Sequence, residues 1–138
     1  MPSRVLPGLG LSGFWALGED GWKDGMDGNL RVLAALVQPR VISVLTADPG
    51  SPADGDIYYF GAGHPTHAHQ LAIRDAGNWV YIPAFAGMEF WNVADKTKYR
   101  FDGTDLVVVP NIVLMASQAE YDALAVKDPN TVYDIPEA

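Results

Sequence analysis

Between Asp54 and Pro110 the sequence repeatedly sets a short β-rich run against a tight-turn signal, and this pattern constrains the fold most. Asp-Gly and Gly-Asn pairs, which favour tight hairpin turns, separate runs of β-branched and aromatic residues. Such runs pair with their neighbours along the chain, so the pattern predicts a small antiparallel β-meander. The predicted hairpins pair residues 71–74 with 79–82 and residues 88–93 with 98–101.

The sequence before and after this region differs in character and suggests the domain organisation. We predict an α+β fold with an N-terminal extended arm and helix, the meander, and a short C-terminal strand-helix-strand module. The expected parts are an extended arm at 1–21, a helix and strand for assembly at 22–46, the β-meander domain at 47–110, and the C-terminal module at 111–138. A chain of 138 residues has the length of one compact domain.

The first 21 residues are rich in glycine and proline, which disfavours regular structure. They are nevertheless apolar, and Phe14 and Trp15 are their largest side chains. We therefore expect an arm that packs either on its own domain or on a neighbouring chain.

The segment from Trp22 to Gln38 predicts a helix that Pro39 ends, with Asp24 or Asp27 as its N-terminal cap. Its apolar residues recur with helical spacing and share one face. The breadth of this face suits an oligomer core, and an ordinary core helix is the alternative. The candidate assembly residues are Phe14, Trp15, Trp22, Met26, Leu30, Leu33 and Val37.

Three more local patterns place the remaining elements. Residues Arg40 to Thr46 are β-rich and predict one strand. Ser117 and Glu120 have the spacing of a capping box, in which the glutamate reaches back to the cap, and they predict a short helix. Residues 131–135 predict a final strand after a Lys-Asp-Pro-Asn turn.

The charge balance disfavours two classes of partner. The net charge is −8, and only 9 Lys and Arg residues are present, which disfavours electrostatic binding to nucleic acid or to an anionic membrane. The chain has no cysteine, so it forms no disulfide and no zinc-thiolate site. No apolar run approaches the roughly 18 residues that a membrane span needs.

No recognised catalytic motif is present, and we expect neither an enzyme nor a cofactor. The acidic pairs lie beside glycines, where aspartate favours turn geometry. His67 and His69 form the one metal-like pattern, and three copies of this pair could surround an ion on a trimer axis. A polar loop with solvated or locally bonded histidines is the simpler interpretation.

Trp79, Tyr81 and Trp91 are the candidates for binding a glycan or another partner, because exposed aromatic rings on strands can stack on sugars. The alternative is that these rings form the core of a small sheet.

Several motifs occur in the order found in one known family. They are Gly21-Trp22-Lys23-Asp24-Gly25-Met26-Asp27-Gly28-Asn29-Leu30, Leu36-Val37-Gln38, Pro49-Gly50-Ser51-Pro52-Ala53-Asp54-Gly55-Asp56-Ile57-Tyr58, Leu71 to Tyr81 and Tyr99 to Leu106. Over residues 14–109 the chain resembles a family of phage tail-fibre and gene-transfer-agent proteins, from which it departs at Gly87-Met88. Residues 117–133 resemble a short module common in phage tail and baseplate proteins.

The resemblance implies a structural protein of a bacteriophage virion, made in the host cytoplasm. It implies a homotrimer near the tail fibre that contacts other tail proteins and serves host attachment. Because the chain has no long shaft, an adaptor or short fibre is expected. A cell-surface carbohydrate-binding module without catalysis is the alternative, and the family brings no catalytic residues to carry over.

Overall fold

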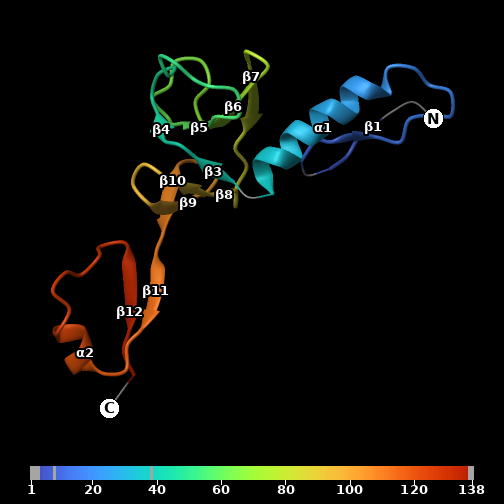
Figure 1. Cartoon of the computed structure of the whole chain (residues 1–138). Coiled ribbons are helices and arrows are strands. Elements are labelled where there is room, and N and C mark those ends of the chain that lie inside the picture. The colour runs from blue at the N-terminus through green and yellow to red at the C-terminus, as the bar shows by residue number, and fades with distance from the viewer. Residues whose placement is uncertain (1–3, 8, 38, 137–138) are drawn as a thin grey trace.

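The computed structural model describes residues 4–7, 9–37 and 39–136, and shows a mostly β protein with two helices (Figure 1). The two larger sheets have the strand orders β10-β9-β8-β3 and β4-β5-β6-β7, and two-stranded sheets lie toward either end of the chain. The elements are β1 (Arg4–Val5), β2 (Ser12–Gly13), α1 (Trp22–Leu36), β3 (Arg40–Val41), β4 (Val44–Leu45), β5 (Ile57–Phe60), β6 (Gln70–Asp75), β7 (Asn78–Pro83), β8 (Glu89–Asn92), β9 (Thr97–Phe101), β10 (Leu106–Val109), β11 (Asn111–Leu114), α2 (Gln118–Asp122) and β12 (Thr131–Asp134).

The hairpins predicted from turn signals are confirmed. In the first, β6 and β7 pair antiparallel from Gln70 opposite Pro83 to Asp75 opposite Asn78. Ala76 and Gly77 form the two-residue turn with φ values of 48° and 75°, as a tight hairpin of this type requires. The second hairpin joins β8 to β9, and β10 adds to β9 in the same antiparallel sense.

The prediction of one antiparallel meander is wrong, because the strands form two mixed sheets. The segment predicted as a single strand from Arg40 to Thr46 is divided into β3 and β4. β3 pairs parallel with β8, and β4 pairs parallel with β5, so this segment joins both sheets. Turn signals report only pairing between sequence neighbours, and these parallel pairs link strands that a hairpin does not connect.

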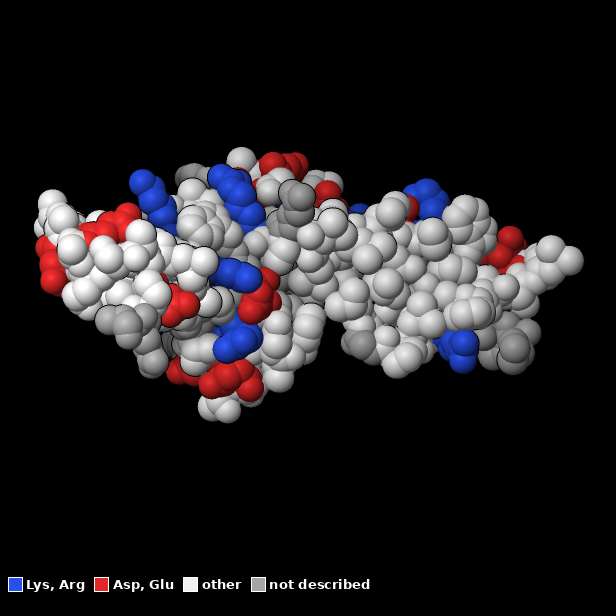
Figure 2. All heavy atoms as spheres, turned by 90° about the horizontal axis from the view of Figure 1, so that it is seen from below, with Lys and Arg blue, Asp and Glu red and all other residues white. Residues whose placement is uncertain are grey.

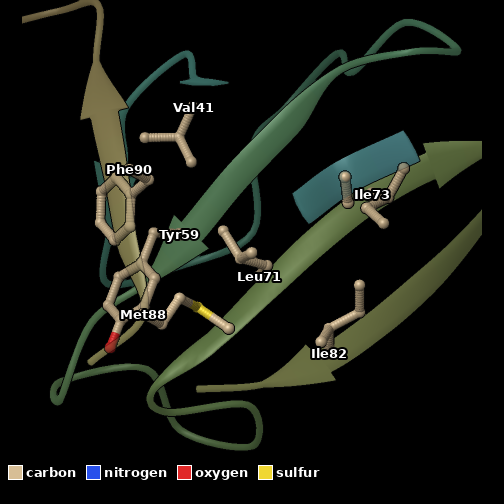
Figure 3. Close-up of a cluster of buried hydrophobic side chains, with 8 residues drawn as sticks. Val41, Tyr59, Leu71, Ile73, Ile82, Met88 and Phe90 are labelled. Atoms are coloured by element: carbon tan, nitrogen blue, oxygen red, sulfur yellow. The ribbon is translucent and has the colours of Figure 1, made fainter. Parts of the chain in front are cut away.

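The core lies where the two larger sheets face each other (Figure 3). The rings of Tyr59 and Phe90, one from each sheet, stack with centroids 4.9 Å apart. Val41 from β3 and Leu71 from β6 are fully buried beside them. The C-terminal half of α1 covers this core through Ala35, its one buried side chain.

The N-terminal arm is not simply extended, because β1 and β2 pair antiparallel, with Arg4 opposite Gly13. The turn between them is closed where the Leu6 N–H donates to the Leu11 carbonyl at 2.7 Å. The predicted helix is confirmed as α1, but neither proposed aspartate caps it: Gly21, with φ of 84°, holds the cap position and makes no side-chain bond. Residues 1–3, Gly8 and Gln38 lie outside the described part of these predicted elements.

The chain leaves the sheets through Pro110, which separates β10 from β11, and ends in a small module (Figure 1). There β11 pairs parallel with β12, and α2 lies between them in sequence. The predicted cap is confirmed, since the Ser117 hydroxyl accepts the Glu120 N–H at 3.3 Å. The Glu120 carboxylate accepts the Ala116 N–H at 2.6 Å, one residue before the expected partner. Residues 137–138 of the predicted module lie outside the description.

Candidate assembly and binding surfaces

The N-terminal hairpin packs on the first half of α1. The Asn29 side chain bonds the backbone of Ser12 in both directions, accepting its N–H at 2.8 Å and donating to its carbonyl at 2.7 Å. Trp15 lies against Gly25, where a Cβ would come within 2.6 Å of the indole. The glycine, which weakens the helix by itself, thus makes room for the arm.

A neighbouring face of α1 is largely exposed, and we call its apolar residues the α1 stripe. Trp22, Leu30 and Val37 expose 53%, 59% and 73% of their surface, which is unusual for large apolar side chains at regular helical spacing. The stripe consists of Trp22, Met26, Leu30, Leu33 and Val37.

The remaining predicted assembly residues lie in the arm and differ from each other. Phe14 is exposed, and the Arg4 guanidinium lies 4.2 Å from the centre of its ring. Trp15 is half-buried in contact with its own helix. The structure thus places Trp15 in an intrachain contact and leaves four of the five stripe residues exposed. Leu33 is partly buried.

The outer face of the β4-β5-β6-β7 sheet carries a group of neighbouring aromatic rings, some stacked and some edge-on. We call it the aromatic layer, and it consists of Tyr58, Phe60, Trp79, Tyr81 and His67. Strand register brings the rings together, because Tyr58 and Tyr81 are both opposite Ala72, from either side. Arg74 lies over the Trp79 ring at 5.3 Å. Burial raises the pKa of the Tyr81 hydroxyl above its usual range.

The two candidate metal-ligating histidines face different partners. His67 stacks on Tyr81 with ring centroids 3.6 Å apart. His69 Nδ1 lies 3.2 Å from the Tyr59 hydroxyl, on the side of the core. Among the described residues, no three His, Cys, Asp or Glu side chains come together as a metal site. Both rings are therefore engaged locally within one chain.

Trp91 lies on the other large sheet, so the structure does not bring it together with Trp79 and Tyr81. It is 39% exposed and lines a pocket of about 480 Å³. The neighbours of Trp91 across the sheet are Arg40 on β3 and Lys98 on β9.

Sequence reasoning missed Tyr58, Arg40 and Lys98 as neighbours of the candidate aromatic residues. The alternation of outward positions on β5 could have revealed Tyr58, since it precedes the buried Tyr59. Arg40 could not have been found in this way, because its position depends on the parallel pairing of β3 with β8.

The C-terminal module exposes its own apolar residues. Ile112 and Leu114 point to one side of β11 and are largely open. On the other side Tyr121 of α2 contacts Tyr133 of β12 edge-on, with centroids 5.2 Å apart. No helix in the described residues is long and apolar enough to cross a membrane.

Comparison with known proteins adds two matches. Residues 117–135, which contain α2 and β12, match the family described as a phage tail tip domain. No curated protein matches the sequence. Residues 26–107, more than half of the chain, match the other family, and they span most of α1 and both large sheets. The chain therefore belongs to the family described as "Protein of unknown function (DUF2793)".

Proposed function

We propose that this protein is a structural component of a bacteriophage virion, namely a tail fibre, short fibre or adaptor that serves assembly and host attachment. The match of residues 117–135 to a phage tail tip domain carries this proposal. The module stands apart from the sheets beyond Pro110, in a position where other tail proteins can reach it (Figure 1). The proposal includes no catalytic step.

The proposal further holds that the protein assembles as a homotrimer through the α1 stripe. Burying such a stripe removes about 25 cal/mol of unfavourable free energy for each Å² of apolar surface. A second and a third copy can supply matching stripes, because identical helices carry the same apolar residues at the same heights. The hairpin on the adjacent face leaves most of the stripe exposed.

Light scattering coupled to size exclusion tests this assembly. The expected mass is three times the 14.9 kDa of the chain. Leu30→Asp, in the stripe, is expected to give monomers, because a buried unpaired carboxylate opposes association. Leu17→Asp is the matched control, since Leu17 is fully exposed in the turn before α1. A wild-type monomer at micromolar concentration, or equal effects of the two variants, would contradict trimer formation through this face.

Carbohydrate binding at a cell surface is a second candidate function, favoured by the aromatic layer. Trp79 and Tyr81 lie with ring centroids 6.4 Å apart and are partly exposed, a spacing on which a sugar ring can stack. A glycan array with wild type and Trp79→Ala tests it. Binding that disappears in the variant supports this site, and an array without any signal would contradict the function.

A further inference from the structure

The pocket beside Trp91 combines an aromatic wall with a basic rim. Its volume is about 480 Å³, within the range of small-ligand sites, and it opens to solvent. Apolar surface dominates its lining, and charged side chains complete it. The lining residues are Pro39, Arg40, Glu89, Phe90, Trp91 and Lys98.

The sheet register builds this arrangement. Arg40, Trp91 and Lys98 form one row across β3, β8 and β9, because β3 and β9 flank β8. The next outward row along β8 sets Glu89 opposite Arg100. The backbone N–H of Trp91 donates to the Pro39 carbonyl at 2.9 Å, which holds the segment before β3 against the pocket.

Three cations and one carboxylate meet on this face. Glu89 accepts from Lys98 at 2.5 Å and lies 3.9 Å from Arg100, while Arg40 has no ion pair within the described part of the chain. The hydrogen bond from Lys98 lowers the pKa of Glu89, so the carboxylate is charged at neutral pH. The local excess of positive charge contrasts with a net charge of −8. Figure 2 shows Lys and Arg side chains grouped on the central body, with acidic side chains beside them.

We propose that this pocket binds a saccharide carrying a carboxylate or phosphate group. The Trp91 indole stacks on the sugar ring, and the Arg40 guanidinium binds the anionic group with two parallel hydrogen bonds. The Glu89 carboxylate accepts hydrogen bonds from ring hydroxyls. The inference rests on the second candidate function and places the anion-binding site on the opposite sheet from Trp79.

The distribution of charge on the protein favours binding of a short anionic ligand over a long polyanion. A long polyanion such as nucleic acid meets the whole negative surface. A short ligand with one to three anionic groups meets mainly the local cations within a Debye length of about 8 Å. Hydroxyl donors on the ligand also suit the one carboxylate in the lining, which would repel a ligand that offers only acceptors.

Isothermal titration of the full chain with trigalacturonate, glucose 6-phosphate and neutral galactotriose tests the proposal. Binding is expected for one or both anionic sugars, at least about tenfold tighter than for galactotriose. The two anionic probes distinguish carboxylate from phosphate recognition. Trp91→Ala and Arg40→Gln are each expected to raise the Kd about tenfold or more.

Two control variants match these changes. Phe85→Ala removes a half-exposed aromatic ring that does not line the pocket, and Lys96→Gln removes a cation that does not line it either. Both are expected to leave the Kd of the anionic sugar unchanged. Arg40→Gln keeps the pocket's apolar lining, so it remains informative if Trp91→Ala perturbs the fold.

The outcomes separate this inference from the broader function. Equal affinity for the anionic and neutral sugars, or loss of binding only in Trp79→Ala, would overturn the Trp91 site while carbohydrate binding stands. An absence of binding to all three sugars overturns the inference, and a positive glycan array would still support the broader function.

Discussion

The indole of Trp15 lies so close to Gly25 that a Cβ at residue 25 would come within 2.6 Å of the indole Cζ2 atom. In an exposed helix, Gly→Ala stabilises by about 1 kcal/mol. Gly25→Ala is expected not to give this stabilisation, because the rigid Trp15 indole must move and the hairpin of β1 and β2 must shift with it. The measurements are the free energy of unfolding and the emission of Trp15 in a variant that lacks the other tryptophans.

Gly28→Ala is the matched control for that change. Outside the adjacent residues and the helix's own backbone, no atom lies within 4 Å of a Cβ built at Gly28. The substitution is therefore expected to stabilise by about 1 kcal/mol and leave Trp15 emission unchanged. Equal stabilisation by the two substitutions would show that the arm does not pack on α1 in solution.

Phe90→Ala is expected to destabilise the protein by about 3–5 kcal/mol, since it removes the ring that stacks on Tyr59 at the centre of the core. Phe85→Ala changes the same side chain at a half-exposed position and is expected to cost about 1 kcal/mol or less. Urea denaturation measures both values. Similar costs would contradict a core centred between the two large sheets.

The stability of the protein is expected to fall at high pH because of Tyr59. Burial raises its pKa to about 12, whereas a tyrosine in the unfolded chain titrates near 10. Between these values the unfolded state releases the proton that the folded state keeps, so the free energy of unfolding decreases as pH rises. Below about pH 10 both states hold the proton, and Tyr59 adds no pH dependence.

Urea denaturation of wild type and Tyr59→Phe across this alkaline range tests the assignment. The variant loses the ionisable hydroxyl, so its free energy of unfolding is expected to fall less steeply with pH. Parallel curves for the two proteins would assign the effect to other tyrosines.

Ser117→Ala is expected to weaken α2 by about 1 kcal/mol, because the Ser117 hydroxyl accepts the Glu120 N–H at the start of the helix. Hydrogen exchange should become faster at Glu120 and its helical neighbours and remain unchanged in the two large sheets. Ser51→Ala, in an exposed loop, is the control. Faster exchange in β6 as well would contradict the expectation that loss of the cap affects only the C-terminal module.

Local sequence patterns correctly predicted the secondary-structure elements that depend on residues close together in the chain. The period of Met26, Leu30 and Leu33 placed α1, and the Ala76-Gly77 turn placed the hairpin of β6 and β7. The cap at Ser117 could also be predicted from the sequence, because its hydrogen bonds involve residues only a few positions away.

Patterns of this kind could not predict the division of residues 40–46 between two sheets. Val41 pairs with Asn92, which lies about fifty residues further along the chain, and no turn residues in the sequence indicate such a contact. The pocket at Trp91 escaped prediction for the same reason, because Arg40 reaches it only through that pairing. The aromatic candidates themselves were visible, whereas their distribution over two sheets depended on tertiary structure.

The α1 stripe and the C-terminal module lie at opposite ends of the chain, with the sheets between them (Figure 1). If copies of the chain associate through the α1 stripe, the two large sheets and the C-terminal module of every copy point outward from the shared helices. Several weak sites then meet a cell surface together, and the first contact raises the effective concentration of the next to the millimolar range. Avidity gained in this way can reach about 10²–10⁴ without any change in a single site, so weak binding by an isolated chain is compatible with firm attachment by the assembly.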